Sequence, residues 1–305
     1  MTESWRQMMS VGIVHFMAFP EGDPVEQIRY LGEDDFFDVV EIKPYEPAIM
    51  EQIKSICDQA GMSIGIGAQP GLQAGKHSLN NQCEEARKAA VDSVKGAVDA
   101  GYLVDARIVA CLSGPMPDNE ADIPAEMDAM VKSCVEICQY AQEKADGDTI
   151  FLSVEQFDDT IDKKCLIGPT PLAVELAERV REQVDNFGLT ADLSHLPMLP
   201  GNQADMLAEM NPYLIHMHAG NCVIADESLH LYGDLHPRFG YPGSENDVPE
   251  LVEFLRSLIY VGYFQNPVPT DKPILTFEVK PWDGDSSELL VAHTKRSFRR
   301  AWAQV

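Results

Sequence analysis

Short apolar runs alternate with longer amphipathic segments along most of this chain. The runs are rich in Val, Ile, Leu and Phe, and most are almost continuously apolar, as parallel strands covered on both faces should be. We therefore predict eight strands, at residues 11–16, 39–42, 63–68, 106–111, 149–155, 188–192, 214–218 and 274–279.

The segments between these runs have the spacing of helices that bury one face. In residues 84–100, for example, Ala86, Ala90, Val94 and Val98 form an apolar stripe. The predicted helices span residues 25–32, 47–60, 84–100, 127–144, 171–184, 203–210, 248–261 and 289–302. Eight alternations of strand and helix are typical of an α/β fold, the (β/α)8 TIM barrel, in which all strand C-terminal ends open onto one mouth. No linker, low-complexity tract or charge block divides the sequence, so we expect one domain over residues 1–305.

One connection is much longer than the others. Residues 219–247 follow the seventh predicted strand and are rich in Gly, Pro, Asn and Asp, whereas strand-to-helix loops usually have about 2–6 residues. We expect this loop to lie over the active face of the barrel. Within it, His236, Arg238 and Phe239 are candidates to close over a bound ring. A surface loop held by its prolines is the other interpretation.

Composition narrows the classes of partner. The formal net charge is −26 and the pI is about 4.5, which repels phosphate backbones and anionic lipid. We therefore expect neither a nucleic-acid nor a membrane partner. The sequence shows no apolar core of a secretory signal and no run of about 20 apolar residues, so we expect a cytoplasmic location. Its seven cysteines form no CxxC pair, which favours reduced thiols over a zinc-thiolate site.

Four of the predicted strands end on residues that a divalent metal would accept. These are Glu155, Asp192, His218 and Glu278. Three carboxylates and one imidazole make a hard, mostly oxygen site that suits Mn²⁺, Mg²⁺ or Co²⁺. Each carboxylate on its own is equally compatible with a helix cap or an ion pair. Because a barrel brings all four strand ends together, the set as a whole predicts a metal site.

Two further histidines stand close to this set in the sequence. His195 forms a DxxH pattern with Asp192, and its spacing places it either at the same ligand or against the turn that follows the strand. We favour contact with the ligand. His216 alternates with His218 along one strand, so both imidazoles face the same side. We interpret His216 as a hydrogen-bonded core residue.

Several motifs together carry a family resemblance. Glu155, the DLSH of residues 192–195, the HMHAGN around His218 and the FEVKP around Glu278 resemble the xylose isomerase-like TIM barrels. The similarity is greatest to the sugar isomerases and epimerases, which include tagatose and psicose 3-epimerases. The arginine that follows the HxH motif in those epimerases is not matched here, and the nearest arginine is Arg238.

The resemblance implies a role for each matching residue. In the family, the equivalents of Glu155, Asp192, His218 and Glu278 bind Mn²⁺ or a related ion, the two glutamates exchange protons with an enediolate, and the DxxH histidine contacts the substrate. This implies Glu155, Glu278 and His195 as catalytic residues. Mn²⁺ is the expected ion, with Mg²⁺ and Co²⁺ as alternatives.

The implied function is a metal-dependent sugar isomerase or epimerase that abstracts a proton next to a carbonyl through a metal-stabilised enediolate. A second interpretation is a lyase that acts on 3-keto-glycosides by elimination, similar to the metal-binding alpha subunit of C-glycoside deglycosidases. A third, a sugar-binding barrel without activity, is disfavoured by the complete ligand set. Endonuclease IV, another relative, is disfavoured by the acidic charge. The expected partners are a small carbohydrate and, in addition, a second copy of the chain or a small β-rich subunit.

Other polar residues near the predicted mouth are candidates to bind the hydroxyl groups of a sugar. They are His15, Glu41, His236, Arg238 and Lys280. Glu41 is the preferred one, because a carboxylate at a strand end needs either a partner or a ligand.

Overall fold

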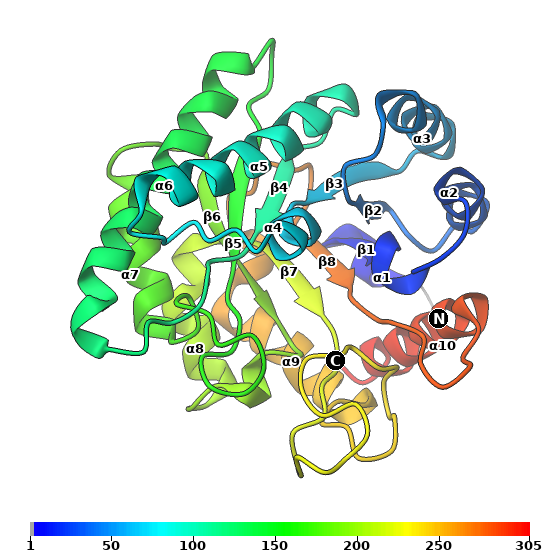
Figure 1. Ribbon diagram of the computed structural model, residues 1–305. Helices are drawn as coiled ribbons and strands as arrows, with labels where there is room; N and C mark the ends of the chain where they lie inside the picture. The colour runs from blue at the N-terminus through cyan, green and yellow to red at the C-terminus, as the bar shows by residue number, and fades with distance from the viewer. Residues whose placement is uncertain (1–2) are drawn as a thin grey trace.

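The computed structural model describes residues 3–305, which form a closed barrel of eight parallel strands (Figure 1). The strands are β1 Ser10–Val14, β2 Val39–Ile42, β3 Ser63–Gly67, β4 Ile108–Cys111, β5 Phe151–Glu155, β6 Phe187–Asp192, β7 Leu214–Ala219 and β8 Ile274–Phe277. Neighbours in sequence are neighbours in the barrel, and β8 closes on β1 through pairs such as Gly12 with Thr276. The predicted (β/α)8 architecture is confirmed.

Helices surround this inner ring of strands (Figure 1). They are α1 His15–Ala18, α2 Pro24–Gly32, α3 Pro47–Ala60, α4 Gln69–Gly75, α5 Glu84–Leu103, α6 Ile123–Lys144, α7 Thr170–Arg181, α8 Gln203–Met210, α9 Val248–Val261 and α10 Ser287–Trp302. Short 3-10 turns lie at η1 Ser4–Gln7, η2 Glu120–Asp122, η3 Leu196–Met198, η4 Asn211–Tyr213 and η5 Tyr263–Gln265. Of the helices in residues 3–305, none has the length together with the apolar content that a membrane crossing requires.

Local sequence signals set many of the helix ends. Asp247 and Glu250 form a capping box at the start of α9, and Gly262 ends that helix in the left-handed conformation, with φ 83°. Asn202 caps α8 through its side-chain oxygen. The short helices α1 and α4 lie outside the predicted set, because four and seven residues are too few to show a helical period.

The interior of the barrel is unusually polar. TIM barrels are normally filled with branched apolar side chains, but Ser153, Thr190, His216 and Glu41 are all buried here. Hydrogen bonds join Ser153 of β5 to Thr190 of β6 and Thr190 to His216 of β7. A further hydrogen bond joins His216 to Glu41 of β2. A contact between β7 and β2, which are not neighbours in the ring, can only pass through the barrel interior.

The segment between β7 and α9 is described throughout and contains no helix or paired strand, only an isolated bridge between Val223 and Gly233. Two buried asparagines fasten it. Asn221 donates to the carbonyl of Arg238 at 2.9 Å, and its own side-chain oxygen accepts from the backbone N–H of Asn246 at 2.8 Å. The segment is therefore held by buried hydrogen bonds rather than by regular secondary structure.

Candidate metal centre

The four predicted metal ligands converge at the C-terminal mouth of the barrel. Glu155, Asp192 and His218 lie on β5, β6 and β7, and Glu278 directly follows β8. One potential ligand atom from each side chain lies within 4.8 Å of the other three. Nδ1 of His218 is 3.1 Å from Oε1 of Glu155 and 3.0 Å from Oε2 of Glu278. The barrel thus assembles residues that are far apart in sequence.

Asp192 shows most directly that these residues fit a cation. Its Oδ1 accepts hydrogen bonds from the backbone N–H groups of Ser194, at 2.8 Å, and Gly220, at 2.9 Å. Its Oδ2 is buried and has no hydrogen-bond partner within residues 3–305. A buried carboxylate oxygen without a partner is unfavourable, and a divalent ion bound by the neighbouring oxygens would satisfy it.

The charges around His218 set the pKa values of the cluster. Burial lowers the pKa of His218, but the carboxylates of Glu41 and Glu155 reverse this effect and hold the pKa well above its usual value. Burial raises the pKa of Glu278, and the charges of His236 and His218 more than offset it, so that this pKa is lowered. The carboxylates therefore favour positive charge at this position, which a divalent cation would supply when His218 is neutral.

Gln69 at the start of α4 positions one of the catalytic candidates. Its Nε2 donates to Oε2 of Glu155 at 2.9 Å. Because the other oxygen, Oε1, faces His218, each oxygen of Glu155 has a defined neighbour. The side chain of Glu155 is also almost completely buried, so the protein itself fixes its orientation.

A second polar group lies beside the first. Asp192, His195 and His236 also place one ligand atom each within 4.8 Å of one another, which is the spacing of a metal-binding group. The buried Asp234 stands between the two imidazoles, with Oδ1 at 3.3 Å from Nε2 of His195 and 3.0 Å from Nε2 of His236. Lys163 reaches the other oxygen of Asp234 at 3.5 Å.

Asp234 controls the charge of both histidines. Burial lowers the pKa of His195, but the adjacent carboxylate outweighs it and raises the pKa to about 10. The same balance raises the pKa of His236 to about 9. Both imidazoles are therefore positively charged at neutral pH. His195 also donates from Nδ1 to the carbonyl of Gln156 at 2.7 Å, which fixes the orientation of its ring.

A cavity of about 210 Å³ opens onto the cluster. Glu155, His218 and Glu278 line it, and its other lining residues include Phe16, Met17, Gln69, Phe157, Lys163 and Trp282. Aromatic faces beside a few polar groups are typical of sites for small polar molecules. Nζ of Lys280 lies 4.5 Å from the ring centre of Trp282 at this mouth.

The remaining substrate-contact candidates divide into two groups. Glu41, His236 and Lys280 line the cavity, whereas His15 and Arg238 are absent from the described residues that line it. His15 begins α1 instead of ending β1, and its Nε2 lies 2.9 Å from the side-chain oxygen of Gln27. Arg238 lies over the ring of Tyr241.

Phe239 does not close over the mouth. It is fully buried and packs edge-on against Phe277 of β8. The aromatic side chain of the long loop therefore belongs to the core, because burial against another ring removes far more of its surface from water than a contact at the rim would.

Sequence reasoning missed Asp234 and gave no role to Lys163. Both lie in irregular segments, where position along the chain does not tell which way a side chain points. The D-x-H spacing of Asp234 and His236 was the only available signal, and it follows no predicted strand.

A family model described as the xylose isomerase-like TIM barrel matches residues 25–290. The chain belongs to this family. The predicted resemblance is thereby confirmed. No curated protein matches the chain.

Solved structures share the fold at low sequence identity. A D-psicose 3-epimerase from Clostridium cellulolyticum H10, solved with D-tagatose, is 15% identical, with a TM-score of 0.71 over 97% of this chain and 99% of the other. A 3-keto-D-glucoside 4-epimerase from E. coli is also 15% identical, with a TM-score of 0.69 over 97% and 99%. An AP endonuclease of family 2 from Brucella melitensis is 18% identical, with a TM-score of 0.65 over 92% and 95%. Such likeness shows the fold, so function must be argued from the site.

Proposed function

We propose that this chain is a divalent-metal-dependent isomerase or epimerase that moves a proton next to the carbonyl group of a small sugar. The observation that carries the proposal is the convergence of Glu155, Asp192, His218 and Glu278, together with the buried Oδ2 of Asp192, which has no hydrogen-bond partner among the described residues. The sugar epimerases among the structural neighbours support the substrate class.

The protein supplies the ligands and the proton carriers. Asp192, clamped through Oδ1, and His218 would hold the ion together with Glu155 and Glu278, and Mn²⁺ suits this hard donor set. When bound, such an ion stabilises negative charge on a substrate oxygen as the adjacent C–H bond breaks.

Glu155 and Glu278 are the proton carriers in this proposal. They come from β5 and from the end of β8, and both reach the same cavity. One carboxylate would take the proton from carbon and the other would return a proton from the opposite side. The charged imidazoles of His195 and His236 would attract the oxygen that becomes negative, and Lys280 and Trp282 would bind the rest of the sugar.

A keto-glycoside is the second candidate substrate. The E. coli neighbour is a 3-keto-D-glucoside 4-epimerase, and a 3-keto group acidifies its neighbouring C–H bonds as the carbonyl of a free sugar does. The same proton abstraction would lead either to epimerisation or to elimination of the aglycone. Release of the aglycone distinguishes the lyase from the epimerase.

The test is hydrogen exchange in deuterated water. The protein is loaded with Mn²⁺ and incubated with ketoses, aldoses and 3-keto-glycosides, and mass spectrometry locates the deuterium. We expect label at carbon next to the carbonyl with one class of substrate, and loss of that label after removal of the ion by a chelator. Wild-type protein that binds Mn²⁺ but labels no member of the panel would contradict the proposal.

Matched variants connect the exchange to the two glutamates. Glu155→Gln and Glu278→Gln each should lower the exchange rate by about 10²–10⁴-fold, the usual contribution of a positioned acid or base. Glu143→Gln removes an exposed carboxylate from α6 and serves as the control for charge. Exchange close to the wild-type rate in both active-site variants would remove the assigned roles.

A further inference from the structure

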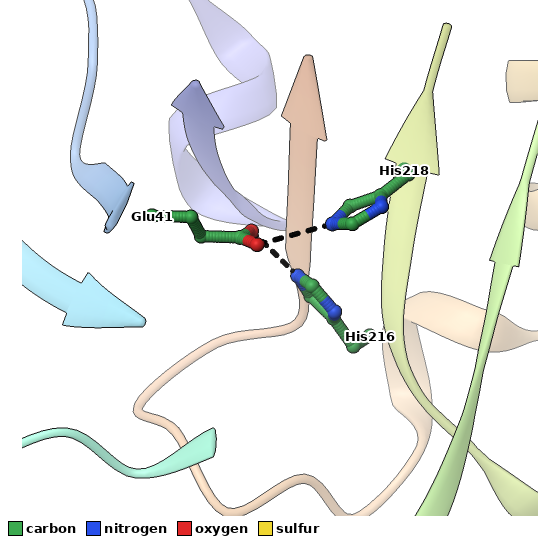
Figure 2. A group of neighbouring side chains, drawn as sticks. All are labelled: Glu41, His216 and His218. Carbon is green, nitrogen blue, oxygen red and sulfur yellow. Dashed lines mark hydrogen bonds and ion pairs between the residues drawn. The ribbon is translucent and has the colours of Figure 1, made fainter. Parts of the chain in front are cut away.

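Glu41 is buried at the end of β2. Its carboxylate is hydrogen-bonded to two histidines of β7, a strand on the other side of the barrel. Its Oε1 lies 2.7 Å from Nε2 of His216, and its Oε2 lies 3.1 Å from Nε2 of His218. Figure 2 shows both imidazoles pointing from β7 toward this carboxylate. All three side chains are buried. Both oxygens of Glu41 are thus engaged within the protein.

Chemistry sets the direction of the two hydrogen bonds to Glu41. A carboxylate only accepts, so the Nε2 atoms of both histidines must carry the hydrogens that they donate to Glu41. Nδ1 of His216 lies 3.1 Å from the hydroxyl oxygen of Thr190, which in turn lies 2.6 Å from the hydroxyl oxygen of Ser153. The consequence for His218 is that its Nδ1, which faces Glu155 and Glu278, provides the lone pair for an ion.

We infer that Glu41, held in place by His216, is a positioning residue that fixes His218 with Nδ1 directed at the metal. The inference rests on the proposed metal-dependent function. A metal-binding histidine commonly donates its second N–H to a carboxylate, and loss of that carboxylate typically weakens metal affinity by about 10–100-fold. In this role Glu41 does not need to contact a sugar, although it lines the cavity.

The space around Glu41 shows why its hydrogen bonds matter. A second cavity, of about 260 Å³, opens at the opposite end of the barrel between Asp58, Asp105, Arg107 and Asp271 and reaches Glu41 and His216. Glu41 therefore lines both cavities.

On the neighbouring strand, Glu41 stands opposite Gly65, where an added Cβ would come within 3.0 Å of Cγ of Glu41. The missing side chain leaves room for the carboxylate. The close approach to Gly65 and the hydrogen bonds from the two histidines together fix the position of Glu41.

The test measures metal affinity apart from activity. Apoprotein is titrated with Mn²⁺, and free Mn²⁺ is followed by electron paramagnetic resonance. Glu41→Gln keeps the shape of the side chain but brings an N–H group toward one histidine donor, so we expect the Kd for Mn²⁺ to rise by about 10–100-fold. Glu46→Gln, which removes an exposed carboxylate from the same β2–α3 connection, should leave the Kd unchanged.

Two further measurements distinguish positioning from sugar binding and from loss of fold. At saturating Mn²⁺ the Michaelis constant of Glu41→Gln for the sugar should stay within about twofold of wild type. His216→Gln, which removes only the support of Glu41, should weaken Mn²⁺ in the same direction by a smaller factor. If circular dichroism shows that Glu41→Gln does not fold, the Mn²⁺ affinity of His216→Gln tests the inference instead.

The inference is overturned if both variants bind Mn²⁺ as wild type does, or if Glu41→Gln raises only the Michaelis constant. A spectroscopic check uses ¹⁵N-labelled histidine in the Mg²⁺-loaded protein, in which His218 should carry hydrogen at Nε2 and none at Nδ1. Hydrogen at Nδ1 would refute the positioning role. Wild-type protein that binds no divalent ion would refute the proposed function together with this inference, whereas a failure confined to the variants would refute the inference alone.

Discussion

Asp192→Asn offers the most direct test of the metal centre. The Asn oxygen can accept the two backbone hydrogen bonds now made by Oδ1 of Asp192, from Ser194 and Gly220. Its NH₂ group then takes the place of Oδ2, the atom without a partner within the described part of the chain. The substitution therefore preserves the local backbone contacts and removes one metal ligand.

The expected size of the effect follows from binding linkage. At a Mn²⁺ concentration of about 100 times the wild-type Kd, the bound ion stabilises the folded state by about 2.7 kcal/mol. Loss of a direct ligand should weaken binding by at least about 100-fold, the upper end of the range for an indirect partner. The same Mn²⁺ concentration then stabilises the variant by at most about 0.4 kcal/mol. For a chain of this length these values correspond to shifts in Tm of about 4 °C and less than 1 °C.

Thermal unfolding of chelator-treated protein, with and without Mn²⁺, measures both shifts. Asp118→Asn removes an exposed carboxylate from the loop after β4 and should keep the wild-type shift. Circular dichroism of the metal-free proteins checks that Asp192→Asn has folded. Equal Mn²⁺-induced shifts in the wild type and in Asp192→Asn would show that the ion binds elsewhere, and the assignment of the four ligands would have to be abandoned.

Three further predictions concern other parts of the molecule. Lys280→Met should raise the Michaelis constant for the sugar about tenfold and leave the Mn²⁺ affinity unchanged, because the ammonium group lies over Trp282 at the cavity mouth; unchanged steady-state kinetics would exclude the contact. Arg87→Met should lower the free energy of unfolding in urea by about 2 kcal/mol without affecting Mn²⁺ binding. Arg87 is buried, so its ion pairs contribute more than surface pairs do, but Glu84 and Glu136 are partly exposed, which limits the loss. A loss below about 0.5 kcal/mol would contradict this. Burial lowers the pKa of His15 to about 4, so the unfolded chain takes up a proton between pH 6.5 and 4 that the folded protein does not, and stability falls as pH falls through this window. His15→Gln should therefore lose less stability than wild type between pH 7 and pH 5 in urea unfolding, and an identical loss would refute the assignment.

The barrel could be predicted because burial on both faces leaves continuous apolar runs in the sequence. β2 begins and ends at the predicted residues, and the other strands differ by a few residues at their ends. Shorter features could not be predicted in this way. His15 lies at the junction of β1 and α1, where a single residue carries no period that would assign it to either element.

The convergence of the four candidate metal ligands could be predicted because position along a barrel strand is enough to place a side chain at the mouth. No such rule applies to Asp234, whose place depends on tertiary contacts such as the hydrogen bond from its backbone N–H to the side chain of Asp162 at 2.9 Å. Nor could position reveal that Glu41 faces β7 across the interior. Choice of the metal, a partner subunit and a cytoplasmic location stay predictions.

The buried asparagines between β7 and α9 have a consequence for the rate of turnover. Asn221 and Asn246 connect the two ends of this long segment through buried hydrogen bonds of the protein itself, so its ends have little chain entropy left to lose when a sugar binds. In enzymes with a mobile lid, opening of the lid often limits the rate of product release. Here no such delay is expected, and kcat should be insensitive to the viscosity of the solvent.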